Sequence, residues 1–167
     1  MDNIRINTKR FLVRTLLSNE DLKSYLTWMQ NIVENKYILT ARTDYSLGEL
    51  KNFVESDNLS TNRILLGIFD KNQGHIGNIR FSKIDPTKKS VEVGFLIGEY
   101  KFRGIGVAEE VFLASVMWLK SNFQIRTVYL GVNPENTPAL NLYKKLGFVK
   151  IASQTPLSDN LKMKFEL

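Results

Sequence analysis

The sequence predicts an α/β (α+β) domain built on one mixed, mostly antiparallel sheet of about seven strands flanked by about four helices. Apolar residues alternate in short segments, as in strands, and recur at helical spacing in longer ones. The 167 residues have the size of one domain, and 43% of them are hydrophobic, enough to form a core. No repeat, low-complexity tract or Pro/Gly/Ser-rich linker interrupts the chain. We therefore treat residues 1–167 as one domain.

One strand and two helices are predicted first. Residues 10–16 (RFLVRTL) have the pattern of a strand, and a helix should follow over residues 18–33, since a serine and two acidic residues stand at its start. A second helix is expected from Ser46, because this serine lies three residues before Glu49 and matches a capping box. The residues expected to face inward from this helix are Leu47, Leu50, Phe53 and Val54.

The rest of the chain alternates strands and helices. Residues 63–69, 75–84 and 90–97 should form an antiparallel meander, with a turn at 70–74. The further expected elements are a helix over 104–123, a strand over 127–132, a helix over 137–146 ended by Gly147, and strands over 148–153 and 161–166. In the order β-α-α-β-β-β-α-β-α-β-β, the helix that follows the meander predicts a parallel pair in the middle of the sheet.

Composition limits the kinds of site and partner. The net charge of +6 favours an anionic ligand, either a phosphorylated small molecule or nucleic acid. With no cysteine and a single histidine, His75, the sequence has no thiolate or multi-histidine metal site, so no metal is expected. The N-terminus lacks a signal peptide, and no stretch approaches the ~20 apolar residues that span a bilayer. We expect a cytoplasmic protein that does not contact a membrane.

The most informative segment is residues 101–108 (KFRGIGVA), between a predicted strand and a predicted helix. The first amides of a helix have no intrahelical partner and the dipole there is positive, so a turn without bulky side chains can wrap phosphate oxygens. The two glycines could instead merely permit a tight turn. The P-loop pattern is absent from the chain, and Glu109 stands where the dinucleotide-binding fingerprint needs glycine or alanine.

This turn resembles motif A of the GNAT superfamily of N-acetyltransferases, whose pattern is Gln/Arg-x-x-Gly-x-Gly/Ala. Here it reads Lys101-x-x-Gly104-x-Gly106, in which lysine departs from the pattern but keeps the positive charge. A second block, residues 131–148 (GVNPENTPALNLYKKLGF), resembles motif B. Together with the element order, the resemblance covers residues 10–167. The residues of the second block that fall in register are Asn133, Asn136, Ala139, Tyr143 and the Leu146-Gly147-Phe148 ending.

The resemblance implies acetyl-coenzyme A as co-substrate, with its pyrophosphate on the amides of residues 103–108. It also implies that the strand ending at Ile97 splays from the next strand and binds the pantetheine through its backbone. Lys144 and Lys145 lie on a helix flank, where solvated charge is the favoured interpretation, although one of them could meet the outer phosphate. Phe95 and Ile97 could instead be ordinary residues of a buried strand. Asn133 and Asn136 could instead stabilise a turn or cap the following helix. The implied binding residues are Phe95, Leu96, Ile97, Lys101, Arg103, Gly104, Ile105, Gly106, Val107, Ala108, Asn133, Asn136 and Tyr143.

Two residues are candidates for catalysis. Amide formation from a thioester needs a neutral amine and a proton for the departing thiolate. Tyr143 matches the family position whose phenol faces the coenzyme sulfur, and a reference pKa of ~10 suits a general acid; packing on its helix is the alternative. Glu92 could accept the amine proton, directly or through water, or pair with a basic neighbour such as Arg80. His75 is expected in a solvent-exposed turn and is given no role.

In this superfamily the acceptor is chosen mainly by the segment between the first two helices, here residues 31–45. The start of the chain resembles the branch that holds ribosomal-protein N-terminal, polyamine and amino-sugar acetyltransferases. We expect a nucleotide-linked amino sugar or a protein N-terminus, and favour a polyamine least because the segment's few charges balance. Trp28 could instead complete the apolar face of its helix. The candidate acceptor residues are Trp28, Asn31, Tyr37 and Arg42, of which the arginine suits a nucleotide-sugar phosphate.

Two other functions remain open at this stage. The same fold could sense acetyl-coenzyme A without catalysis, although the intact motif residues argue against it. A nucleic-acid or ribosome-binding module would use the positive charge, but it normally shows a basic stripe with interleaved aromatics, whereas the basic residues here are dispersed. The C-terminal strand would also allow pairing across a homodimer.

Overall fold

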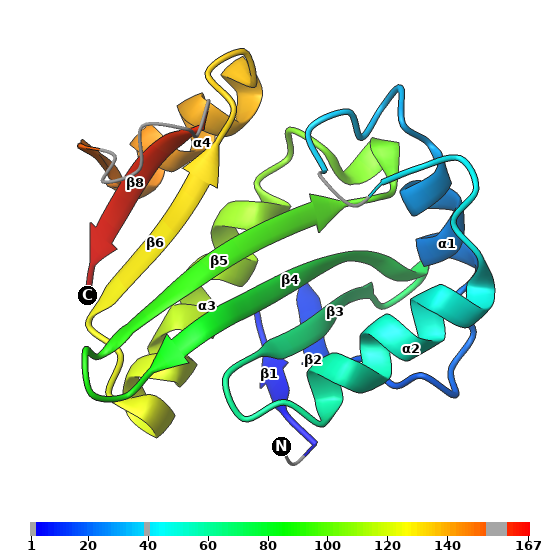
Figure 1. Cartoon of the computed structure of the whole chain (residues 1–167), viewed down its shortest axis with the longest axis horizontal. Coiled ribbons are helices and arrows are strands. Elements are labelled where there is room, and N and C mark those ends of the chain that lie inside the picture. Colours follow the sequence, from blue (N-terminus) through cyan, green and yellow to red (C-terminus); the bar gives the residue numbers. More distant parts are fainter. Residues whose placement is uncertain (1–2, 39–40, 153–159) are drawn as a thin grey trace.

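The chain forms one mixed sheet of eight strands with helices on both faces (Figure 1). The structure is a computed structural model that describes residues 3–38, 41–152 and 160–167. Its elements are β1 (Arg5–Asn7), β2 (Phe11–Thr15), α1 (Lys23–Gln30), α2 (Leu47–Asn58), β3 (Ile64–Asp70), β4 (Gly74–Asp85), β5 (Ser90–Ile97), the 3-10 helix η1 (Tyr100–Phe102), α3 (Val107–Phe123), β6 (Thr127–Val132), α4 (Thr137–Leu146), β7 (Val149–Ile151) and β8 (Leu161–Glu166). The predicted fold class is confirmed, with β1 as a strand more than expected.

The strands lie in the order β1-β2-β3-β4-β5-β6-β8-β7. All neighbours are antiparallel except β5 and β6, which are parallel, with Ser90 opposite Thr127 and Glu92 opposite Tyr129. A parallel pair requires a crossover connection, which α3 provides. The meander and the parallel pair are therefore where the sequence predicts them.

β5 and β6 separate after a short paired stretch. Their pairing ends at Glu92 and Tyr129, although β5 continues to Ile97 and β6 continues to Val132 beside β8. Figure 1 shows the two strands diverging toward their arrowheads. Among the described residues, no strand pairs with the second half of β5 on the side toward β6. The splay implied by the resemblance is present.

Alternation along β5 divides the core between the two faces of the sheet. Val91 and Val93 are buried in the larger cluster, which includes the inner face of α3, and Leu96 is buried in a second cluster with residues of α1 and α2. Figure 1 shows α3 and α4 behind the sheet and α2 in front of β2 and β3. Glu92 shares its face of the sheet with Leu96, so it points away from α3.

The first helix begins later than predicted. α1 starts at Lys23 rather than Ser18, because the acidic residue that looked like part of a helix start closes a turn instead. The Glu20 carboxylate accepts from the Leu17 amide at 3.0 Å and pairs with Arg14 of β2 at 2.5 Å. This ion pair fixes the connection between β2 and α1.

The start of α2 confirms the capping box. The Ser46 hydroxyl accepts from the Glu49 amide, and the Glu49 carboxylate accepts from the Ser46 amide. Leu50 and Val54 are fully buried, as predicted, whereas Leu47 is exposed because it stands in the first turn, outside the packed stripe. In the part of the chain that the structure describes, no helix is long and apolar enough to cross a membrane.

Candidate active site

A glycine turn connects β5 and η1 to α3. Gly104 and Gly106 have φ angles of 74° and 81°, in the left-handed region that favours glycine. No atom lies within 4 Å of the place that a Cβ would take at Gly104. The glycine is therefore required by the backbone angle, not by crowding, and the turn leaves open space beside the first amides of α3, which lack intrahelical partners.

This open space belongs to a cavity of about 550 Å³, here called the donor cavity. Its walls are the second half of β5, the glycine turn, the first turn of α3, one side of α4, and part of the segment after α1. Such a volume is in the usual range for small-molecule sites. The predicted site residues that line it are Tyr37, Phe95, Leu96, Ile97, Arg103, Gly104, Gly106, Val107, Ala108 and Asn136.

Besides Tyr143, three residues implied for cofactor binding lie outside the walls of the donor cavity. The Lys101 ammonium donates to the Gln73 side chain at 2.6 Å, in the turn before β4. Ile105 is 51% exposed. The Asn133 side chain accepts from the amide two residues later at 2.8 Å and thus closes a turn. Each of these side chains has a local structural role or faces solvent.

Arg103 is the most connected side chain of the donor cavity. Its guanidinium donates to the Ile97 carbonyl at 2.8 Å, to the Gly98 carbonyl at 3.3 Å and to the Asn35 side chain at 3.2 Å. It also pairs with Glu34 at 3.4 Å. The sequence did not single out Glu34 or Asn35, because nothing in their spacing shows that the segment after α1 meets the end of β5.

The wall formed by α4 carries a cap and an ion pair. Asn136 accepts from the Ala139 amide at 3.3 Å and caps α4, as the capping interpretation predicts, and it also lines the donor cavity. Lys145 pairs with Glu109 of α3. The lysine proposed for the outer phosphate thus lies at the wall of the donor cavity.

Tyr143 lies on the buried side of α4. Its ring centre is 6.4 Å from that of Phe95 and 5.6 Å from that of Phe148, and the residue is 9% exposed. Burial raises the pKa of Tyr143 to about 12. The phenol is therefore protonated at neutral pH, which a general acid requires, although the side chain does not line the donor cavity.

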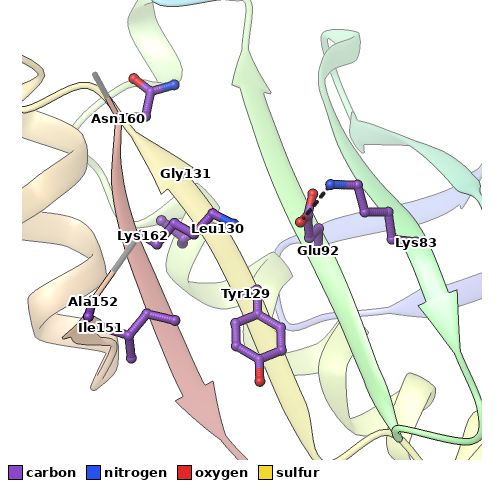
Figure 2. Close-up of a pocket in the computed structure, with 9 residues that line it drawn as sticks. All are labelled: Lys83, Glu92, Tyr129, Leu130, Gly131, Ile151, Ala152, Asn160 and Lys162. Carbon is purple, nitrogen blue, oxygen red and sulfur yellow. Dashed lines mark hydrogen bonds and ion pairs between the residues drawn. The ribbon is translucent and has the colours of Figure 1, made fainter. Parts of the chain in front are cut away.

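Glu92 lines a second cavity of about 520 Å³ on the face of the sheet opposite α3, which we call the open-face pocket (Figure 2). Its carboxylate accepts from the Lys83 ammonium at 2.9 Å and is 37% exposed. The suggested pairing with Arg80 is wrong, because Arg80 binds the buried Asp57 of α2 at 2.5 Å. The residues around the pocket are Lys83, Glu92, Tyr129, Leu130, Gly131, Ile151, Ala152, Asn160 and Lys162.

The family model "Acetyltransferase (GNAT) domain" matches residues 10–149. The chain belongs to the GNAT acetyltransferase family. This match includes the glycine turn and most of the second motif block, so the resemblance drawn from these residues is confirmed.

Named relatives of this GNAT domain are N-acetyltransferases. An N-acetyltransferase 9-like protein of Caenorhabditis elegans is 35% identical over 69 residues, which are 41% of this chain and 34% of that protein. An N-alpha-acetyltransferase of Sulfurisphaera tokodaii is 39% identical over 65 residues, 39% of this chain and 38% of that protein. The alignments therefore span little more than a third of these two relatives.

Solved structures share the GNAT fold over nearly the whole chain. The ribosomal alpha-N-protein acetyltransferase RimL in complex with coenzyme A has a TM-score of 0.83 at 14% identity, with 98% of each chain covered. Spermidine N-acetyltransferase from Vibrio cholerae, in complex with coenzyme A and spermine, has a TM-score of 0.80 at 20% identity and covers 94% of this chain and 95% of that one. At such identities the likeness shows the fold.

The acceptor candidates of this GNAT domain do not gather in one place. Trp28 is buried, and its indole donates to Glu99 at 3.2 Å, which agrees with the packing alternative. The Asn31 side chain is exposed and accepts from the Glu34 amide. Arg42 pairs with Asp44 and Glu49 at the start of α2, so its charge is already balanced by two carboxylates. Tyr37 alone of the four lines the donor cavity.

His75 is not the exposed turn residue that the sequence suggested. Its ring stacks on Phe69 at 4.9 Å and contacts Trp28 at 5.0 Å, and its Nε2 lies 2.9 Å from the Asn78 side chain. Burial lowers the pKa of His75 below its ordinary value. Within residues 3–38, 41–152 and 160–167, no three His, Asp or Glu side chains are grouped as metal ligands.

Proposed function

We propose that this GNAT domain transfers the acetyl group of acetyl-coenzyme A to a primary amine that attacks the thioester directly. One observation carries the proposal: the free edge of β5 and the glycine turn before α3 open into the same donor cavity. A strand edge offers hydrogen-bonding groups to an extended amide-containing arm, and a helix N-terminus favours phosphate. An amide-containing arm and a phosphate-bearing nucleotide are the two halves of coenzyme A.

The residues present fit this co-substrate. The left-handed glycines keep side chains away from the amides of residues 103–108, where the pyrophosphate would lie, and Phe95 to Ile97 present backbone along the splay. When bound, acetyl-coenzyme A supplies an activated acetyl thioester. Arg103 already occupies the Ile97 carbonyl, so the pantetheine would share that carbonyl with the guanidinium or displace it.

The protons are assigned to two residues on different elements. Glu92 would accept the proton of the attacking amine, directly or through water, and Tyr143 would donate a proton to the sulfur. Support for the tyrosine is its raised pKa, which keeps the phenol protonated. Support for the glutamate is its place on β5 at the last paired position before the splay, with part of its side chain exposed to the open-face pocket.

The acceptor is proposed to be a nucleotide-linked amino sugar or a protein N-terminus. The solved relatives acetylate a ribosomal protein in one case and spermidine in another, as their names state. The segment of residues 31–45 is no more acidic than basic, and an acidic pocket is what a polycation would need. A cytoplasmic location is the setting we propose.

Calorimetric titration with acetyl-coenzyme A tests the donor site. Changing Gly104 and Gly106 to Val should weaken binding by about 100-fold or more, because branched side chains would strain the turn and block its amides. Gly74→Val is the matched control: Gly74 has a φ of 72° and open space in a turn outside the donor cavity. Equal affinity in the two folded variants, or no binding by the wild type at millimolar ligand, would overturn the proposal.

A further inference from the structure

The open-face pocket is hollowed by two glycines where β5 and β6 diverge. Gly94 follows Glu92 by two residues, and Gly131 follows Tyr129 by two residues, so all four face the same side of the sheet. No atom lies within 4 Å of a Cβ placed at Gly94, and at Gly131 the nearest is 3.8 Å away, on Asn160. Within the described residues, no helix lies over this part of the sheet in Figure 1.

A β-bulge directs Lys83 into this pocket. The pairing of β4 with β5 shifts register between Ser82 and Asp85, and Lys83 has a φ of 51°, which is uncommon for a residue other than glycine. Ile84 is buried in the core, and Lys83, the extra residue of the bulge, points outward and pairs with Glu92 (Figure 2). Bulges that re-aim a side chain occur often beside functional sites.

Among the described residues that line the pocket, there is one more positive charge than negative. Glu92 is paired with Lys83, whereas Lys162 of β8 is half-buried and its ammonium has no hydrogen bond or ion pair with a described residue. Figure 2 shows the Lys162 side chain extending from β8 over β6, opposite Gly131. Lys164, two residues along the same face, is paired with Glu166 at 3.1 Å. On this face of β8 the unpaired positive charge is therefore that of Lys162.

From these observations we infer that the open-face pocket binds an anionic group, a carboxylate or a phosphate, carried by the amine acceptor and held by Lys162 and Lys83. The inference rests on the proposed function and narrows its substrate class. An anion on Lys83 would compete with the Glu92 carboxylate and release it toward the amine. Glu92 would then accept one N–H proton of the ammonium, leaving the neutral amine that the reaction needs.

The test uses matched probes on wild-type protein, alone and saturated with coenzyme A, followed by calorimetry. Glucosamine 6-phosphate is compared with glucosamine, and the peptide Ser-Asp-Gly amide with Ser-Asn-Gly amide, so that phosphate and carboxylate are separated. Spermidine serves as the cationic probe. We expect at least one anionic probe to bind about tenfold tighter than its neutral partner, since a charge-assisted hydrogen bond is worth roughly one such factor.

Variants then assign the preference to the pocket. Lys162→Gln should remove most of the preference for the anionic probe. Lys83→Asn should reduce this preference, and asparagine tolerates the left-handed backbone of position 83. Lys164→Gln removes the same charge from the same strand face and should leave the preference unchanged, because Lys164 does not line the pocket. Each variant's affinity for coenzyme A is measured as well, and we expect it to be unaltered.

Four results would overturn the inference. These are no binding of either anionic probe, equal binding of the paired probes, tighter binding of spermidine, and an undiminished preference in a folded Lys162→Gln variant. A wild-type protein that binds the anionic probes but not coenzyme A would instead refute the proposed acetyl transfer, so the two failures are distinct.

Discussion

The donor cavity and the open-face pocket lie at the same divergence of β5 from β6 but are built in different ways. The donor cavity is defined by backbone: the left-handed Gly104 and Gly106, the free edge of β5 and the first turn of α3. The open-face pocket is defined by side chains from three strands, Lys83, Glu92 and Lys162. Backbone sites have local sequence signatures, whereas sites of this second kind depend on register.

Because the two regions are built differently, changes in them should affect different steps of the reaction. Changes at the glycine turn should alter affinity for acetyl-coenzyme A, and changes at the open-face pocket, or at the contacts between Arg103 and the segment after α1, should alter use of the acceptor. Tyr143 belongs to the wall of neither cavity and should alter turnover alone.

The largest effect on turnover is expected from Tyr143→Phe. Loss of the proton donor should lower kcat by about 100-fold while the affinity for acetyl-coenzyme A stays within twofold, since general acid catalysis contributes roughly that factor. Because the pKa of Tyr143 is about 12, ionisation of this phenol should not limit the wild-type rate between pH 7 and about pH 10. Steady-state rates over that pH range measure kcat, and calorimetry at pH 7.5 measures the affinity for acetyl-coenzyme A. An unchanged kcat would assign Tyr143 to packing.

Glu92→Gln should reduce kcat by about tenfold to 100-fold, because the amide cannot accept the amine proton. Raising the pH should recover part of the rate, since more of the amine is then neutral in solution. Lys88→Gln, which changes an exposed charged residue in the turn between β4 and β5, is the control. If Glu92→Gln keeps full activity at pH 7, Glu92 only pairs with Lys83.

Arg103→Ala should separate the binding of acetyl-coenzyme A from the binding of the acceptor. The variant loses the hydrogen bonds that hold the Asn35 side chain and the Ile97 carbonyl together, so we expect the KM for the acceptor to rise about fivefold to tenfold. Arg103→Lys retains the charge but not the fork, and should recover little. A change in the affinity for acetyl-coenzyme A alone, with an unchanged acceptor KM, would contradict a role of Arg103 in holding the acceptor segment.

The smallest effect concerns His75, which lines neither cavity and reports on stability. Its pKa is lowered by burial, so the folded state binds fewer protons than the unfolded chain below pH ~6.5. The free energy of unfolding should therefore fall as the pH drops from 7 toward 5, and this fall should be smaller in His75→Gln. Urea titrations at several pH values measure it; an identical pH dependence in both proteins would refute the assignment.

The turn at residues 101–108 and the block at residues 131–148 were predictable because each depends on neighbours in sequence. Helix capping by Ser46 and the left-handed Gly147 were found for the same reason. The start of α1 was misplaced because the Glu20 carboxylate pairs with Arg14 of β2, a partner that no local pattern shows. His75 was misjudged likewise, since Phe69 and Trp28 reach it from other elements.

By itself the sequence determined the fold class, the order of elements, the parallel crossover and the glycine turn, because hydrophobic periodicity and backbone preferences act over a few residues. The tertiary structure alone decided that Glu92 meets Lys83 rather than Arg80, that Arg103 joins the end of β5 to the segment after α1, and that Lys162 lies opposite Gly131. These contacts depend on strand register, on one bulge and on packing between distant segments, which single-residue spacing does not encode.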